Sequence, residues 1–482
     1  MKLKFIVRSI ILSAFVFAFS SAKCEQVQEK SFQYYDSLTY QQYVAGNWND
    51  LIRNGKQALE LGYDYKNLRL RMGFACFYQK NFRIAADHFN KALQFDSYDT
   101  LAALYFNLSC QAAGRSSEIY YVKGSRKPYQ VLDFVYADAG KMLAGNANFN
   151  TTLTDSNVYK EQMQPVSRTF SSLGLNFRPI HNVSVFMGYS QIEITDKKSI
   201  SHLSMDAVRD SISELEFERD YWYSFPISSN LKELELKNKQ SSYYLSATYI
   251  PVPGLKISPS FHYLRINSTS VTATPTATIL SDTAWYNKFD STWHTFEYTA
   301  YNYKVTTADS AYSDYVLSLA ASKDIGKFNV GLNGTYALML NKKFIQFGAS
   351  VSWYPFGNTN LYTNSSFTIQ KSQSANTKIF EQMVGGRIYP SGWLEGFVTM
   401  GELKNFNEKN AYLVYNQAYP VKMRWGMTFY PYIGKHLEVM LMYRYQKIGL
   451  LLSTAKLSDT IPLVSNPDYT YSTLITGVKW KF

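Results

Sequence analysis

The sequence predicts a mainly β protein, in which an antiparallel transmembrane β-barrel of about 14 strands follows a small all-α domain. From residue 128 to the end, apolar residues occupy alternate positions in runs of about ten to fourteen residues, as in tilted membrane strands. Before residue 128 the sequence instead repeats every 34 residues. After residue 22 no stretch approaches the roughly 20 apolar residues of a membrane-spanning helix, which excludes a helical membrane protein.

The composition supports this fold class. Of 482 residues, 46% are hydrophobic and only 18% are charged, so the chain can bury ample apolar surface and is not disordered. Aromatic residues are abundant, with 40 Tyr, 31 Phe and 8 Trp. Three cysteines cannot form a disulfide framework. The remaining class is a Tyr-rich chain of many short amphipathic segments.

Residues 1–22 have the features of a signal peptide. Lys2, Lys4 and Arg8 precede an apolar core from Ile10 to Phe19, and small residues at Ser20 and Ala22 suit cleavage after Ala22. We therefore expect an exported protein. Loss of the three basic residues lowers the net charge from +12 to +9.

Residues 23–127 are predicted to form a periplasmic helical domain. Small and aromatic residues recur at the spacing of two-helix repeats, and Cys110 follows Cys76 by 34 residues on the same buried helix face. This pattern resembles tetratricopeptide (TPR) repeats, which present a concave surface to a peptide or protein. The resemblance implies an unknown periplasmic protein partner. It assigns helix packing to Trp48, Ala58, Gly73, Phe82, Ala85, Phe89 and Ala92.

Residues 128–482 are predicted to form the outer-membrane barrel. Leu437, Leu441 and Tyr443 alternate with the opposite-facing Met440 and Met442. The length of such strands and their aromatic ends place the apolar face outside, toward lipid. The last strand, with Gly477, Trp480 and the terminal Phe482, resembles the signal that outer-membrane barrels present to the barrel assembly machinery.

Short turns give the strand number. Five turns begin after a strand-ending Pro, at Pro179, Pro251, Pro355, Pro390 and Pro431, and Asp324 to Lys327 forms a sixth without proline. Six hairpins and two terminal strands give fourteen strands, with twelve or sixteen as alternatives. Longer loops should face outside, at about 145–163, 197–240, 271–310, 404–420 and 449–468. Residues 197–240 could form a helix inside the lumen or a surface excursion.

Inward positions indicate what the lumen could contact. Basic residues outnumber acidic ones there, which predicts a mildly positive lumen that favours anionic solutes. Tyrosines before the turn prolines could offer their rings to sugars. Excess basic charge on outer loops suits lipopolysaccharide, and no basic stripe indicates nucleic acid. The lumen-facing candidates are Lys256, His262, Tyr354, Arg387, Tyr389, Lys422, Arg424, Tyr430 and Arg444.

The sequence offers little catalytic chemistry. No His/Cys pair has zinc spacing, and no phosphate-binding Gly loop or paired-carboxylate signature is present, so we expect no enzyme, metal or cofactor. His262 with Ser258 and Ser260 on one strand leaves a hydrolase as a remote alternative.

The order of signal peptide, helical repeats and barrel resembles exopolysaccharide-secretion porins. The segment from Gly401 to Phe406, with Val414 to Asn416 and Gly426, also resembles YaiO-family outer-membrane barrels. The resemblance implies an outer-membrane channel that passes a glycan or other solute, with a periplasmic helical arm that binds a partner. The alternative is a non-conducting scaffold that anchors a complex or displays surface loops.

Overall fold

The computed structural model describes most of the predicted helical domain and barrel. The described residues are 31–121, 131–143, 145, 159–205, 227–287, 292–372, 376–416, 419–455, 463–465 and 467–482. The predicted signal peptide, residues 1–22, lies outside them. None of the helices in this part of the chain is long and apolar enough to span a membrane.

Five helices form the N-terminal domain. They are α2 (Phe32–Val44), α3 (Trp48–Glu60), α4 (Lys66–Tyr78), α5 (Phe82–Phe95) and α6 (Thr100–Ala112), followed by the 3₁₀ helix η1 (Ser116–Tyr121). Helices α2, α4 and α6 begin 34 residues apart, as do α3 and α5, so the sequence period corresponds to a two-helix unit. Asp99 caps α6 by accepting hydrogen bonds from the N–H groups of Leu101 and Ala102.

The residues predicted to pack these helices lie in or beside the core. Ala58, Ala85, Phe89 and Ala92 are buried. At Gly73 a side chain would collide with the Phe89 ring, since an added Cβ would lie 2.8 Å from it. The remaining two make ring contacts: Trp48 stacks on Tyr78, and Phe82 meets Phe77 edge to face.

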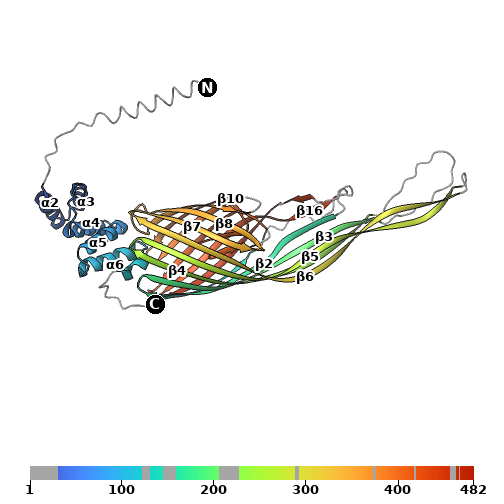
Figure 1. Ribbon diagram of the computed structural model, residues 1–482, viewed down its shortest axis with the longest axis horizontal. Helices are drawn as coiled ribbons and strands as arrows, with labels where there is room; N and C mark the ends of the chain where they lie inside the picture. The colour runs from blue at the N-terminus through green and yellow to red at the C-terminus, as the bar shows by residue number, and fades with distance from the viewer. Residues whose placement is uncertain are drawn as a thin grey trace, which may run out of the picture.

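Fourteen antiparallel strands close into a barrel, as the sequence predicts (Figure 1). Neighbours in the sheet are β1-β18-β15-β14-β11-β10-β9-β8-β7-β6-β5-β4-β3-β2, and the pairing of β1 with β2 closes the ring. The six predicted short turns join β2–β3, β4–β5, β6–β7, β8–β9, β10–β11 and β14–β15. Nine strands of 11 to 14 residues are β1 (Leu132–Met142), β7 (Phe328–Met339), β8 (Lys342–Trp353), β9 (Leu361–Lys371), β10 (Asn376–Tyr389), β11 (Gly392–Leu403), β14 (Val421–Ile433), β15 (Leu437–Gly449) and β18 (Asp468–Lys481).

The other five barrel strands are much longer and correct the prediction of two loops. They are β2 (Tyr159–Ile180), β3 (Val183–Met205), β4 (Ile227–Val252), β5 (Leu255–Asn287) and β6 (Thr292–Ile325), and they extend beyond the rest of the barrel (Figure 1). Most of 197–240 and 271–310, predicted as loops, is therefore strand. These stretches are rich in Ser, Thr and charged residues, so the apolar alternation that identifies the other strands is weak. Their ladder pairing continues nonetheless, from Ser268 opposite Ser310 to Thr278 opposite Ala300.

The barrel is apolar outside and polar inside. On β15, Leu441 is 43% exposed on the outer face, whereas the adjacent Met442 is buried. The C-terminal strand follows the same rule, because Val478 and Trp480 are exposed outside while Gly477 lies against Asp138 within the lumen. The chain end is fixed by a hydrogen bond from the N–H of Phe482 to the carbonyl oxygen of Asp133. This polarity is the reverse of that in a soluble barrel.

Candidate functional site

The segment 404–416 folds into the barrel instead of facing outside, which corrects the prediction for loop 404–420. Strand β11 ends at Leu403, shortly after Gly401, whose φ is 121° and where the pairing with β14 shifts register. The segment then forms a two-stranded hairpin of β12 (Phe406–Glu408) and β13 (Leu413–Tyr415), called the lumen hairpin below. Its tip, Lys409 to Ala411, adopts three consecutive positive φ angles of 50°, 56° and 63°. Non-glycine residues adopt this conformation only when surrounding contacts hold them.

The tip is held by uncharged groups on β4, β5 and β6. The Asn410 carbonyl accepts hydrogen bonds from Tyr244 Oη at 3.0 Å and Ser260 Oγ at 2.7 Å. The Asn410 side chain donates to the Ser258 carbonyl at 3.0 Å and accepts from Ser318 Oγ at 2.8 Å. These bonds tie the tip to three neighbouring strands.

His262 adds a further bond to the tip. Its Nδ1–H donates to the Ala411 carbonyl at 2.7 Å. His262 and Ser260 thus both bind the lumen hairpin, which leaves the hydrolase alternative without support from their geometry.

The base of the hairpin is anchored by Arg424 on β14. This side chain is 3% exposed, and its Nη2 lies 2.9 Å from Glu381 and 2.8 Å from Glu408 of the hairpin. Its Nη1 donates to the hydroxyl of Tyr415 on the returning strand. The hydroxyls of Tyr412 and Tyr136 on β1 also form a hydrogen bond. The lumen hairpin is thereby bonded to strands around the barrel wall and occupies part of the lumen.

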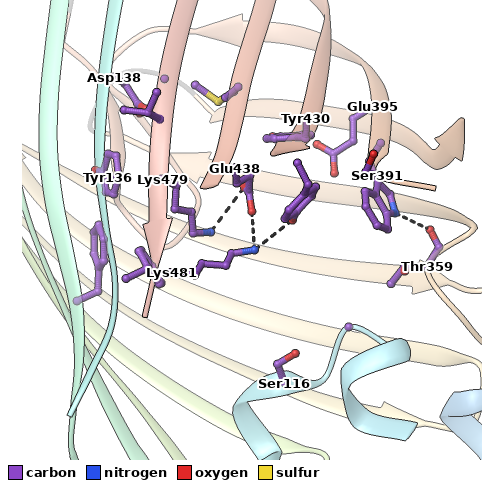
Figure 2. A pocket seen from close by; sticks show the side chains of 18 of the residues that line it. Ser116, Tyr136, Asp138, Thr359, Ser391, Glu395, Tyr430, Glu438, Lys479 and Lys481 are labelled. Atoms are coloured by element: carbon purple, nitrogen blue, oxygen red, sulfur yellow. Dashed lines mark hydrogen bonds and ion pairs between the residues drawn. The ribbon is translucent and has the colours of Figure 1, made fainter. Parts of the chain in front are cut away.

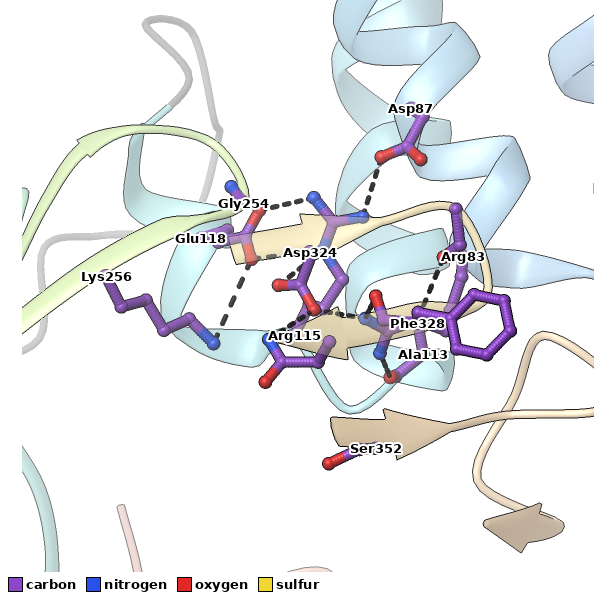
Figure 3. Close-up of polar contacts among 12 residues, drawn as sticks. Arg83, Asp87, Ala113, Arg115, Glu118, Gly254, Lys256, Asp324, Phe328 and Ser352 are labelled. Atoms are coloured by element: carbon purple, nitrogen blue, oxygen red, sulfur yellow. Dashed lines mark hydrogen bonds and ion pairs between the residues drawn. The ribbon is translucent and has the colours of Figure 1, made fainter. Parts of the chain in front are cut away.

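The helical domain closes the opposite end through a cluster of buried charges, called the latch below (Figure 3). Arg83 of α5 forms an ion pair with Asp324 of β6, and their side chains are 2% and 3% exposed. Arg115, just before η1, pairs with Glu118 at 2.7 Å and Asp87 at 2.8 Å. The latch therefore crosses the boundary between helices and barrel.

Further contacts attach the helices to two more of the short turns. Glu118 accepts from the N–H of Gly254 at 2.8 Å and lies 3.9 Å from Lys256, beside the β4–β5 turn. The N–H of Arg83 donates to the Gly357 carbonyl at 2.9 Å, and the Asn358 side chain donates to the Lys80 carbonyl at 2.9 Å. These hydrogen bonds thus join polar groups of the helical domain to the barrel turns.

Burial also shifts the acid–base behaviour of the helical domain. Burial raises the pKa of Asp87, although Arg115 opposes this, and raises the pKa of Cys76 to about 12. Burial and the nearby charges of Arg69 and Lys56 lower the pKa of His88 to about 3, with Asp64 opposing. Cys76 and Cys110 are free, buried thiols, as expected of small apolar residues in a helix core.

Between the lumen hairpin and the helices lies a cavity of about 1100 Å³, called the chamber below (Figure 2). Lys409 and Tyr412 of the hairpin line it on one side, and Gln111, Gly114 and Ser116 of the helical domain on the other. Ten of its lining residues are aromatic: Phe134, Tyr136, Phe186, Tyr244, Tyr354, Tyr362, Trp393, Tyr412, Tyr430 and Tyr432.

The charged groups that line the chamber are balanced. Its three acidic residues, Asp138, Glu395 and Glu438, face three basic ones, Lys409, Lys479 and Lys481. Glu438 lies 2.6 Å from the Lys481 Nζ and 3.8 Å from the Lys479 Nζ. The prediction of a positive lumen is therefore wrong for this part of it. The prediction failed because it counted basic residues that lie outside the chamber and overlooked the acidic residues that balance the chamber lysines.

The structure distributes the nine predicted lumen residues over several places. Tyr354 and Tyr430 line the chamber, whereas Tyr389 packs against Phe429, which faces outward. His262 and Arg424 hold the lumen hairpin, and Lys256 lies at the latch. The remaining three lie apart from these groups. Arg387 covers the Trp393 ring at 5.2 Å, Lys422 pairs with Asp468 at 2.7 Å, and Arg444 donates to the Met442 sulfur at 3.4 Å.

Sequence reasoning missed most of the chamber. Trp393, Glu395 and Tyr362 were not singled out, although the strand alternation that places Tyr430 inward also places Glu395 opposite Thr428 on the same face. A search for inward aromatic residues beside inward carboxylates on adjacent strands would have found them.

Comparisons with known proteins complete this description. No protein-family model and no curated protein matches the sequence. Among solved structures, the chain is similar to a Pseudomonas aeruginosa FadL homologue, with a TM-score of 0.40 and 6% identity over 77% of this chain and 94% of that one. It is similar to a bacterial polysaccharide outer membrane secretin, with a TM-score of 0.34 and 7% identity over 74% and 100% of the two chains. It is also similar to the translocator domain of autotransporter NalP from Neisseria meningitidis, with a TM-score of 0.29 and 9% identity over 80% and 99%.

Proposed function

We propose that the protein is an outer-membrane channel that is closed at rest and passes a glycan or another solute. The observation that carries this proposal is the chamber, a large preformed space inside a barrel whose outer surface is apolar. An apolar exterior suits a bilayer, and the paired barrel strands leave no open sheet edge along most of the wall. The expected signal peptide and the C-terminal strand ending in Phe482 support export and handling by the barrel assembly machinery.

In this proposal the two closures act as gates. Solute passes only when the lumen hairpin leaves the outer half of the barrel and the helical domain leaves the inner mouth. The helical domain docks through α5, α6 and η1, whereas Tyr34 and Tyr40 of α2 remain exposed. TPR-like repeats bind proteins. A periplasmic protein that binds this exposed side could therefore weaken the latch and undock the helical domain. We expect lipopolysaccharide to lie beside the extended outer strands. In this proposal the protein performs no catalysis.

A second candidate function is a non-conducting scaffold. It is favoured by the number of bonds that hold the lumen hairpin, because a permanent plug would also be bonded on all sides. The scaffold would anchor a periplasmic complex and display the extended strands.

Planar-bilayer conductance separates the two functions. We would compare the intact protein with a variant in which residues 405–415 are replaced by a short Gly-Ser linker, and with Lys422→Ala as a control on strand β14. The channel predicts rare openings of the intact protein and steady conductance of the hairpin variant, with Lys422→Ala unchanged. Silence of a correctly folded hairpin variant, even after the latch is broken by Arg83→Met, would contradict the channel and favour the scaffold.

A further inference from the structure

We infer that the chamber binds an uncharged sugar unit, and this inference rests on the proposed channel because it names the solute for which the chamber is shaped. Three features of the chamber carry it: fixed aromatic faces, a balanced set of charges, and carboxylates arranged to accept hydrogen bonds.

The aromatic rings are held in place before any solute arrives, and arginines already lie over two of them: Arg387 over Trp393 at 5.2 Å and Arg83 over Tyr354 at 4.0 Å, which leaves the opposite faces for a solute. Trp393 donates its indole N–H to the Thr359 carbonyl at 3.2 Å and meets Tyr432 edge to face, with ring centroids 5.3 Å apart. On the adjoining wall, the Tyr354 and Tyr362 rings stack with centroids 5.9 Å apart. Sugar rings have C–H faces that pack on aromatic rings, and preformed rings lose little conformational entropy when they bind.

The charges argue against an ionic solute. The acidic and basic lining residues are equal in number, and Lys481 is already bound to Glu438 and donates to the Tyr432 hydroxyl at 3.1 Å. A bound uronate or phosphate would have to compete with Glu438 for this lysine. Breaking such a pair in a partly desolvated site is costly. An anionic glycan is therefore disfavoured.

The polar groups argue against an apolar solute as well. Glu395 accepts a hydrogen bond from Tyr362 Oη at 2.5 Å and lies beside Tyr430 in the chamber wall (Figure 2). Tyr430 also forms a hydrogen bond with Glu395, but a carboxylate has more acceptor sites than two donors can fill, so Glu395 retains capacity for further donors. A hydrocarbon would leave this capacity unmet, whereas sugar hydroxyls supply donors that match it.

The size of the chamber sets the length of the bound segment. At about 1100 Å³ it exceeds the roughly 300–1,000 Å³ of pockets for drug-sized ligands, so it has room for a short oligosaccharide. A longer glycan would have to displace Tyr412 of the lumen hairpin or Ser116 of the helical domain. The chamber thus holds one segment of a glycan chain, and the rest of the glycan can enter only when the two gates are open.

Isothermal titration calorimetry on the full chain in detergent tests the inference. The probes are maltotetraose as the neutral sugar and tetragalacturonate as the anionic one. Both are measured on the intact protein and on the variant with residues 405–415 replaced, so that access does not limit binding. We expect maltotetraose to bind at least tenfold more tightly than tetragalacturonate. Trp393→Ala should weaken maltotetraose binding at least tenfold, whereas Trp425→Ala, whose ring stacks on Tyr445 on the outer face, should not.

A second variant keeps the test decisive if Trp393→Ala fails to fold. Glu395→Gln keeps the shape of the side chain but weakens its acceptor, and we expect a several-fold loss of maltotetraose binding. The inference is overturned if tetragalacturonate binds more tightly, if neither sugar binds to the intact protein or to the hairpin variant, or if Trp393→Ala and Trp425→Ala bind alike. Failure of the channel has a different signature, namely maltotetraose binding without any conductance.

Discussion

The lumen hairpin and the helical domain line opposite sides of the chamber, and these two proposed closures are held by different chemistry. At the helical end, the latch joins three basic and three acidic side chains, of which Asp87 and Lys256 are partly exposed and the other four are buried: Arg83, Arg115, Lys256, Asp87, Glu118 and Asp324. At the outer end, the tip of the lumen hairpin is held by hydroxyl, amide and imidazole groups that bond to its backbone and to Asn410.

This difference determines how each closure can open. The latch charges share partners, since Arg115 contacts Asp87, Glu118 and Asp324, so removing one charge leaves buried groups incompletely compensated and weakens the whole cluster. Removing one neutral bond from the hairpin costs only about 1 kcal/mol, so the tip weakens by degrees. In the proposed channel, a partner protein or a change in solution conditions could therefore release the latch in one cooperative step. The lumen hairpin would instead lose its bonds one by one to a solute that competes for them in the chamber.

The largest effect should follow from breaking the latch. Arg83→Met leaves the buried Asp324 with Arg115, whose Nε lies 3.7 Å away, as its remaining ion-pair partner, and we expect the docking of the helices to weaken by about 3 kcal/mol. Hydrogen–deuterium exchange of α5 in the full chain measures this. Arg53→Met is the matched control, because Arg53 pairs with Asp50 at 2.7 Å but is 68% exposed. Equal exchange in the two variants would show that the latch does not hold the domain.

A smaller effect is expected at the base of the hairpin. Arg424→Ala leaves Glu381 and Glu408 without their shared partner, but both carboxylates retain some exposure, so we expect a loss of about 2–3 kcal/mol. The readout is the reaction rate of a thiol introduced at the hairpin tip by Lys409→Cys. Lys422→Ala on the same strand removes an exposed ion pair and should leave this rate unchanged. Equal rates in the two backgrounds would contradict the role of Arg424.

Acid should weaken the helical domain by a comparable or smaller amount. Neutral His88 accepts a hydrogen bond at 3.2 Å from Arg69, and its pKa is lowered from 6.5 to about 3 in the folded protein. The unfolded chain therefore binds a proton as the pH falls through 6.5, while the folded chain does not. Stability present at neutral pH is lost on acidification, by about 2 kcal/mol between pH 7 and 5.

Helix melting followed by circular dichroism of the full chain at both pH values measures this loss. His88→Gln cannot titrate and should flatten the pH dependence. A wild-type melting temperature that is the same at pH 7 and pH 5 would show that His88 is not the source.

The smallest effect concerns a single tip bond. Ser260→Ala removes one donor to the Asn410 carbonyl, which still accepts from Tyr244, so we expect about 1 kcal/mol, or roughly a fivefold faster exchange of hairpin amides. Thr269→Ala, which removes an exposed bond to Asp309, should not change that exchange. An effect of Ser260→Ala as large as that of Arg424→Ala would remove the distinction between tip and base.

Much of the fold could be predicted because it depends on local periodicity. Alternating residues such as Leu441 and Met442 identify a strand and its two faces, and turn prolines such as Pro390 count the hairpins. The 34-residue period locates the helices, since each unit must bury the same face against its neighbour. The extended halves of β5 and β6 were harder to predict because Ser and Thr interrupt their apolar alternation, although Ile200, Leu236 and Val271 form a small buried cluster where the long strands begin to extend.

The sequence by itself therefore determined the barrel, its strand number and the helical repeat, because these follow from interactions between residues close in sequence or in regular register. Only the tertiary structure decided that the segment 404–416 points inward, that the charges of the lumen are balanced, and that Arg83 meets Asp324. Those contacts join residues more than a hundred positions apart, such as Asn410 with Ser258 and Glu118 with Gly254. No local pattern encodes such a pairing, since each partner gains its stabilisation only after the barrel has closed.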